Sequence, residues 1–266
     1  MIKILVPVDF SATSSKALFY AIELFQAAAL EITLLHVYSS NPTTMALKDI
    51  DHVIEKDSKR TMNKIVEKVE KAYPDISVKS KVIRDHAVSA ITSLGNSGAY
   101  DFVVMGTKGA SGLKEVFLGS ISGGVISKTM APVVVVPAGY SFRPLKEIVL
   151  ALSNTPFSDD KILDPLRKLA AVHKSRIKVL HFSEEQTHLI EKALADIQDL
   201  NPSIEYAFGT GDTNKDLSEY LSINESGMLC LIRGHKGFFE RLFKGSVTLK
   251  QTFESPVPLL ILHDIV

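Results

Sequence analysis

Three glycines and a serine between residues 106 and 120 have a spacing that points to chemistry. Gly106, Gly109, Gly119 and Ser120 form the pattern G-x2-G-x9-G-S, which follows the apolar run DFVVMG and precedes a helical pattern. Glycine lets the backbone curl and brings bare N–H groups close to a phosphate, because no Cβ intervenes. A helix that begins at Ser120 adds unpaired amides and the positive end of its dipole. The segment therefore predicts an anion site built mainly from backbone.

Other chemistry finds less support in the sequence. Lys108 and Lys114 lie in the same loop and are candidates either for phosphate contacts or for solvated surface residues. The sequence contains no GxxxxGK[ST], no GxGxxG after its first strand, no HExxH and no GxSxG. We therefore predict no catalytic residue and no metal site. The alternative for the glycines is a set of turns in a loop that binds nothing.

The elements that must position this loop occur twice along the chain. The run IKILVPV, a helical pattern over residues 14–29 and the run EITLLHV are matched by EIVLAL, a helical pattern over 159–173 and RIKVLHF. His36 aligns with His181 and Gly106 with Gly234, and we interpret the two histidines as a repeated packing contact. We predict one domain over residues 1–138, a linker over 139–146 and a second domain over 147–266.

Each half continues with strands and helices in alternation. Further strands are predicted at residues 76–83, 101–106 and 132–138, and again at 203–208, 228–234 and 256–263. A polar helical stretch at 43–73 has a shorter counterpart at 184–200. Strict alternation predicts the α/β class: in each domain, a five-stranded parallel open sheet with helices on both faces.

The composition limits the classes of molecule that the chain is expected to bind. The 266 residues include 30 basic and 30 acidic side chains. The chain therefore lacks the excess of positive charge that attracts nucleic acids. No leader-like start and no apolar run of about 18 residues is present, which predicts a cytoplasmic protein with no membrane partner. The one cysteine, Cys230, stands in the apolar run MLCLI and is expected to be buried.

The first half resembles a universal stress protein domain of the ATP-binding subgroup over residues 1–138. ILVPVDFSATS, LLHV and VVMGTKGASGLKEVFLGS are similar to the family's first strand and turn, second strand and signature loop. The resemblance implies an adenine nucleotide alpha hydrolase-like fold and an acid at the end of the first strand that meets the nucleoside. Here that acid is Asp9, with Pro7 and Val8 beside it. A carboxylate at this place can accept hydrogen bonds from ribose hydroxyls. The alternative role for Asp9 is a turn or helix cap.

The same resemblance implies the remaining contacts. Val37 would lie near the adenine, and Met105 is a further candidate contact to the nucleotide. The residues around the phosphates would be Gly106, Lys108, Gly109, Gly119, Ser120 and Ile121, with Ser122 as a further candidate. The implied cofactor is ATP, with AMP and ADP as alternatives and Mg as a candidate companion.

The second half departs from the family pattern. Ser153 stands where the first half has Asp9, and only seven residues separate Gly237 from Gly245. Phe238, Phe239 and Phe243 also crowd this shorter loop. We expect weak or no ATP binding there, although the helix start at Gly245 and Ser246 could still take a lone phosphate.

The leading hypothesis is an ATP-binding stress-response or signalling module. A slow ATPase or phosphotransferase and a nucleotide-free interaction scaffold are the alternatives. In the family that the chain resembles, fifth strands pair across a dimer axis. We therefore expect an intramolecular pseudo-dimer, with a further homodimer and an unknown protein partner left open.

Overall fold

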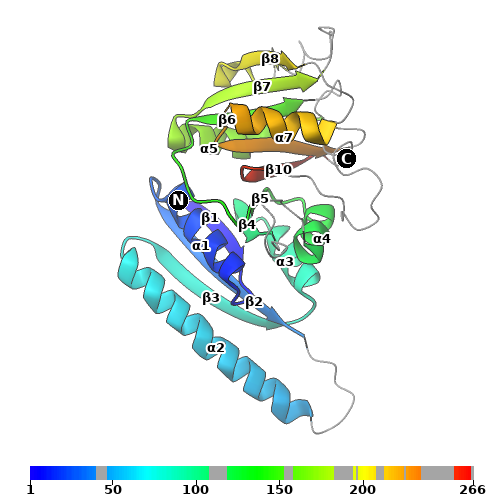
Figure 1. Cartoon of the computed structure of the whole chain (residues 1–266). Coiled ribbons are helices and arrows are strands. Elements are labelled where there is room, and N and C mark those ends of the chain that lie inside the picture. The colour runs from blue at the N-terminus through cyan, green and yellow to red at the C-terminus, as the bar shows by residue number, and fades with distance from the viewer. Residues whose placement is uncertain are drawn as a thin grey trace.

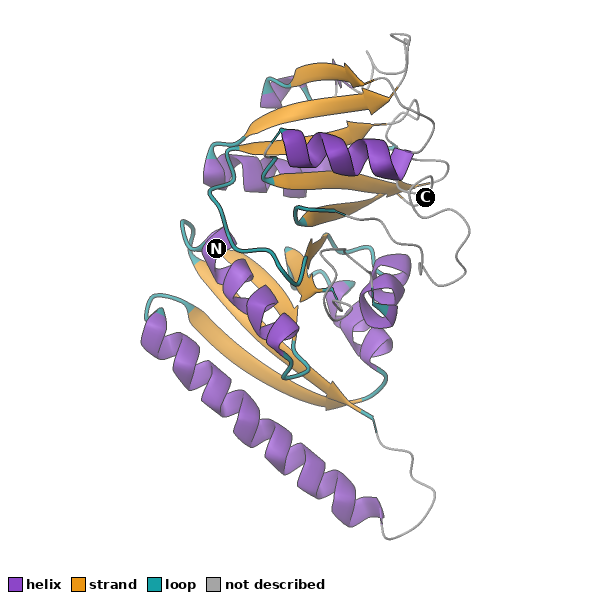
Figure 2. Cartoon of the chain, viewed as in Figure 1, coloured by secondary structure: helices purple, strands orange, loops and turns teal. Residues whose placement is uncertain are grey.

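The computed structural model describes residues 1–39, 47–107, 119–152, 158–182, 194–195, 197–207, 213–224, 226–234 and 255–264. Within these residues, both halves of the chain contribute to one ten-stranded sheet that carries helices on its two faces (Figures 1 and 2). The predicted α/β class is confirmed.

The first half forms one end of this sheet. Its elements, in chain order, are β1 Ile2–Pro7, α1 Ala12–Phe25, β2 Leu30–Tyr38, α2 Leu47–Ala72, β3 Ser77–Arg84, α3 Ala87–Gly95, β4 Phe102–Gly106, α4 Ser120–Lys128 and β5 Val133–Val136. The strands are parallel and lie in the order β3-β2-β1-β4-β5. The chain therefore reverses its direction of sheet growth between β1 and β4, and ligands bind in open α/β sheets at the carboxyl ends beside such a switch point.

The inner strands are nearly continuous apolar runs because both of their faces are covered. Ile4 and Val6 of β1 pack in one cluster with Leu18 of α1, whereas Leu5 belongs to the cluster on the opposite face, with Val125 of α4. All of these side chains are fully buried or nearly so. This double burial is what parallel strands between two helical layers require.

The second half repeats the arrangement. Its elements are β6 Glu147–Leu152, η1 Asp160–Leu163, α5 Asp164–His173, β7 Arg176–Phe182, η2 Gln198–Leu200, β8 Ser203–Ala207, α7 Thr213–Ile223, β9 Met228–Gly234 and β10 Leu259–Asp264. The strand order β8-β7-β6-β9-β10 matches that of the first half. Cys230 is fully buried in β9, as expected.

One predicted helix differs from the observed one. The helix expected over residues 159–173 opens with the 3₁₀ turn η1, and the regular α-helix begins only at Asp164. Pro165 explains the break, since proline has no N–H to donate and fits the first turn of a helix rather than its interior. Most of the stretch predicted at 184–200 lies outside the described residues.

The two halves join through their fifth strands. Val133, Val134 and Val135 of β5 pair antiparallel with Ile261, Leu260 and Leu259 of β10. This pairing within one chain is the one that the sequence led us to expect.

The segment between β5 and β6 and two polar contacts also connect the two halves. Tyr140 and Phe142 of this segment pack edge-on against Tyr20 of α1, with ring centroids 6.0 and 5.8 Å apart. Nε2 of His173 in α5 lies 2.6 Å from the Leu24 carbonyl oxygen, and Lys168 forms an ion pair with Asp101. No helix among the described residues has both the length and the apolar character needed to cross a membrane.

Candidate functional site

A cavity of about 500 Å³ opens at the carboxyl ends of β1, β2 and β4, beside the switch point. This volume lies within the range of small-molecule sites in proteins. Helices α1, α3 and α4 contribute their first residues to its wall, so three helix N-termini converge on one space. Their dipoles make the cavity favourable for negative charge.

The wall of the cavity has two parts. Apolar side chains come from Leu35 and Val37 on β2, Ile91 on α3 and Met105 on β4. The polar part consists of residues from the β1–α1 turn and from the start of α4: Asp9, Ser11, Thr13, Ser14, Ser120 and Ser122. Such a wall suits a ligand with one flat apolar end and one anionic or hydroxylated end.

Ser11 fixes the turn between β1 and α1. Its side chain accepts a hydrogen bond from the Ser14 amide at 3.1 Å and so caps α1. The Ser11 amide in turn donates to Asp9 Oδ1 at 3.0 Å. Phe10 between them has a φ of 65°, a left-handed conformation that is uncommon for a non-glycine residue. The turn is therefore defined by several interactions, and Asp9 has both a turn role and a place in the cavity wall.

The Asp9 carboxylate stays ionised. Burial raises its pKa, but hydrogen bonds from Ser11 and Ser14 lower it more, and the net pKa lies below the ordinary value. An ionised carboxylate is an acceptor only, so Asp9 can take hydrogen bonds from hydroxyl or amino groups of a ligand.

His36 of β2 contacts the turn between β1 and α1 through its side chain. Its Nδ1 lies 2.8 Å from the Val8 carbonyl oxygen, and its ring stacks on Phe10 with a centroid distance of 4.1 Å. His181 makes the equivalent contact in the second half, with Nδ1 3.1 Å from the Leu152 carbonyl oxygen. The interpretation of the two histidines as a repeated packing contact is confirmed.

The start of α4 presents backbone donors. Gly119 is its N-cap and provides no side-chain cap, and the first amide bonded within the helix is that of Gly123, which donates to the Gly119 oxygen at 2.9 Å. The amides of Ser120, Ile121 and Ser122 precede that bond, as at any helix start. Because all three residues line the cavity, these amides are available to an anion there.

The end of β4 lies close to the first turn of α1. A Cβ at Gly106 would come within 2.7 Å of Thr13 Cγ2 and 3.0 Å of the Thr13 carbonyl oxygen, so only glycine fits. The next residue, Thr107, is 1% exposed and lines the cavity, and its Oγ1 has no hydrogen-bond partner among the described residues. A buried hydroxyl without a partner is costly, which is consistent with a ligand or water that satisfies it.

Every predicted site residue that the structure describes lines this one cavity. These residues are Pro7, Val8, Asp9, Val37, Met105, Gly106, Gly119, Ser120, Ile121 and Ser122. Lys108, Gly109 and Lys114 lie outside the described residues. In the second half, Ser153 and the loop from Gly237 to Ser246 also lie outside them.

Sequence reasoning missed several residues of the wall: Ser11, Thr13, Ser14, Leu35, Ala87, Ile91 and Thr107. Two signals could have found some of them. Leu35 and Val37 are two apart on one strand and so share a face. Ser11, Thr13 and Ser14 follow Asp9 at the start of a helix, a place where polar side chains can reach a ligand as well as cap the helix. No local sequence pattern indicated Ala87 and Ile91, because they reach the cavity only through the position of α3 in the fold.

Comparison with known proteins agrees with this architecture. The model of the universal stress protein family matches residues 1–137. A universal stress protein of Methanocaldococcus jannaschii is 28% identical over 151 residues, which cover 50% of this chain and 93% of that protein. Universal stress protein YxiE of Bacillus subtilis is 31% identical over 144 residues, which cover 50% of this chain and 97% of YxiE.

A crystal structure of a universal stress protein from Archaeoglobus fulgidus is similar along the whole molecule. It aligns with 98% of each chain at a TM-score of 0.73 and 22% identity, which shows a shared fold. The family match spans more than half of the 266 residues. The chain belongs to the universal stress protein family.

Proposed function

We propose that this chain is a tandem universal stress protein whose first half binds an adenine nucleotide and which acts as a stress-response or signalling module. The observation that carries the proposal is the two-part cavity, in which an apolar wall adjoins three helix N-termini and one carboxylate. Nucleotides combine a flat base, a hydroxylated sugar and an anionic tail. Each of these parts has a matching surface in the cavity.

The base would lie against Leu35, Val37 and Met105, where it is shielded from water. The Asp9 carboxylate, at the end of β1, would accept hydrogen bonds from the ribose hydroxyls. Charge-assisted hydrogen bonds of this kind contribute about 1.5–3 kcal/mol. Asp9 would therefore fix the orientation of the nucleoside.

The phosphates would lie at the start of α4. The amides of Ser120, Ile121 and Ser122 point along the helix axis toward the anion, and the helix dipole adds to the attraction. Lys108 and Gly109, which lie between β4 and α4 in the sequence, would complete this end of the site. Mg would accompany a di- or triphosphate bound there.

The tandem form rests on the two matching strand orders and on the β5–β10 pairing. In the second half, Ser153 replaces the acid and the glycine loop is shorter. We therefore propose one nucleotide per chain, held by the first half.

Binding rather than turnover is the proposed activity. Asp9 is the only carboxylate among the described residues of the cavity wall. Its lowered pKa makes it a weak base, whereas a general base works best with a pKa near the operating pH. Attack on a γ-phosphate also needs a residue that orients water.

Calorimetry on protein stripped of ligand tests the proposal. ATP, ADP and AMP are titrated separately, with inorganic phosphate as a comparison, and we expect one site per chain for at least one nucleotide. Asp9→Asn should weaken that binding by about tenfold or more, since it removes a charged acceptor. Absence of heat with every adenine nucleotide would leave the scaffold alternative, and turnover of Mg-ATP by wild-type protein would favour the enzyme alternative.

A further inference from the structure

We infer that Gly124 is a positioning residue, whose missing side chain lets α4 approach Val88 of α3 and so places the first amides of α4 at the cavity. The inference rests on the proposed nucleotide site and concerns its phosphate end. Helices α3 and α4 lie side by side (Figure 1), and the first residues of both line the cavity.

The contact between the two helices leaves no room for a methyl group. A Cβ at Gly124 would lie 2.8 Å from Val88 Cγ2 and 3.2 Å from Val88 Cγ1. The nearest atoms all belong to this one side chain, whose Cβ would be at an ordinary 3.7 Å. Valine in a helix strongly prefers one χ1 rotamer, so Val88 cannot easily turn its methyl groups away. An added methyl must therefore push the helices apart.

The contact lies directly behind the proposed phosphate site. Gly124 is four residues after Ser120, so the two share a face of α4 and lie roughly 6 Å apart along its axis. Val88 directly follows Ala87, which lines the cavity. The spacing between Gly124 and Val88 thus sets the position of the Ser120 amide.

The opposite end of α4 is held in place. Asn96, which follows α3, accepts hydrogen bonds through Oδ1 from Thr129 Oγ1 at 3.0 Å and from the Met130 amide at 2.7 Å. These bonds anchor the end of α4 to the end of α3. Bulk added at Gly124 would therefore move mainly the N-terminal end, the end with the proposed phosphate donors.

Nucleotide affinity in four full-length proteins tests this geometry: wild type, Gly124→Ala, Val88→Ala and the double variant. We expect Gly124→Ala to weaken binding of the nucleotide preferred by wild type by about tenfold, a coupling typical of residues in contact. Val88→Ala removes the two methyl groups that clash, so the double variant should return to within about threefold of Val88→Ala alone. The titrations are run well below the melting temperature of each variant.

Gly227→Ala is the matched control. Gly227 lies in the second half, outside the cavity wall, and a Cβ there would meet Leu145 Cδ1 at 2.8 Å. It should lower thermal stability and leave affinity within about twofold. If Gly124→Ala does not fold, Val88→Ile adds bulk from the α3 side and should weaken binding, whereas the isosteric Val88→Thr should not.

Two results would overturn the inference: wild-type affinity in Gly124→Ala, or a loss that Val88→Ala does not restore. If Gly124→Ala cannot be measured, equal nucleotide affinity in Val88→Ile and wild type would also overturn the inference. Failure of the wild type to bind any nucleotide would instead contradict the proposed function, so the two failures are distinguishable.

Discussion

Ser11 is the residue on which the geometry of the β1–α1 turn depends. It caps α1 through its side chain and orients Asp9 through its amide. We expect Ser11→Ala to lower the free energy of unfolding by about 1 kcal/mol, and Ser11→Gly by only a few tenths, because glycine tolerates the cap position better. Urea denaturation measures both, with Ser15→Ala as the control inside the helix. Equal losses for alanine and glycine would contradict a capping role.

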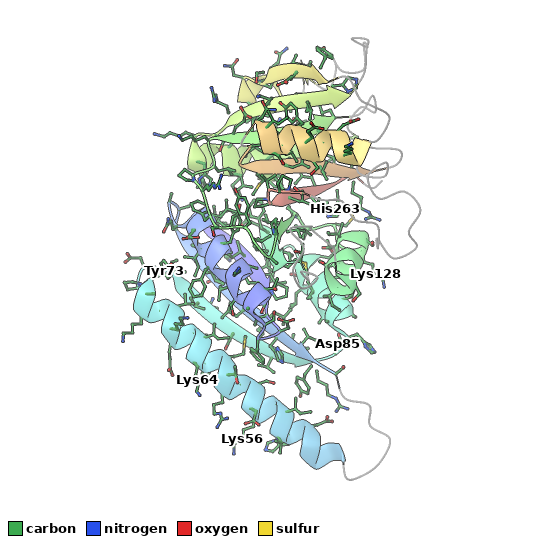
Figure 3. All side chains as sticks on the ribbon, viewed as in Figure 1. Lys56, Lys64, Tyr73, Asp85, Lys128 and His263 are labelled. Atoms are coloured by element: carbon green, nitrogen blue, oxygen red, sulfur yellow. The ribbon has the colours of Figure 1, made fainter. Side chains whose placement is uncertain are left out.

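His263 gives the protein a pH dependence that can be attributed to one side chain. It lies in β10 at 8% exposure, near the junction of the two halves (Figure 3). Burial lowers its pKa to about 4, and the positive charge of Arg233 acts in the same direction. The folded protein therefore keeps His263 neutral at pH values where the unfolded chain already binds a proton.

The sign of the effect follows from that difference. The stability associated with neutral His263 is complete above the ordinary histidine pKa of about 6.5 and is lost as the pH falls toward 4. The loss should reach about 3 kcal/mol at full protonation. His263→Leu should therefore lose less unfolding free energy than wild type between pH 7 and pH 4.5, by urea denaturation. The exposed His52, replaced by leucine in α2, is the control; an unchanged pH dependence in His263→Leu would exclude this account.

At the scale of elements, the contact between β4 and α1 depends on Gly106. Because a Cβ there would clash with both the side chain and the backbone of Thr13, Gly106→Ala must separate the strand end from the helix. We expect a loss of about 1–3 kcal/mol in the free energy of unfolding, as for other overpacked sites. Gly139→Ala, with nothing within 4 Å of the added Cβ, should be close to neutral under the same chemical denaturation. A neutral Gly106→Ala would show that the turn can relax.

Most elements could be predicted from the sequence because their signals are local. The apolar runs predict the inner strands, since those strands are buried on both faces, and the helix predicted from Ser120 begins there. The cavity was only partly predictable. Glycine spacing and the family resemblance indicated one side of the cavity. Ala87 and Ile91 reach it through α3, the helix that connects β3 to β4, and no local sequence pattern predicts where that helix packs.

At the scale of the whole molecule, Lys168 and Asp101 form an ion pair between the second and first halves. Burial raises the pKa of Asp101, but Lys168 and the Lys3 amide lower it more, and the net pKa lies below the ordinary value. The stabilisation is therefore present above the unfolded pKa near 4 and is lost as the pH falls through the lower folded value.

A double-mutant cycle with Lys168→Met and Asp101→Asn tests this connection. At pH 7 we expect a coupling of up to about 1 kcal/mol in the free energy of unfolding, since both side chains are partly exposed. At pH 2.5 the coupling should be smaller. A zero coupling at pH 7 would mean that the halves unfold independently of this pair.

The β5–β10 pairing has a consequence for stoichiometry. Two identical subunits related by a twofold axis must carry identical sites, so a change in one is a change in both. Here the paired units are parts of one polypeptide and can diverge, as Asp9 and Ser153 do at corresponding positions. Because the two paired sheet halves belong to one polypeptide, they can differ permanently, and a sequence change in one half leaves the other unaltered.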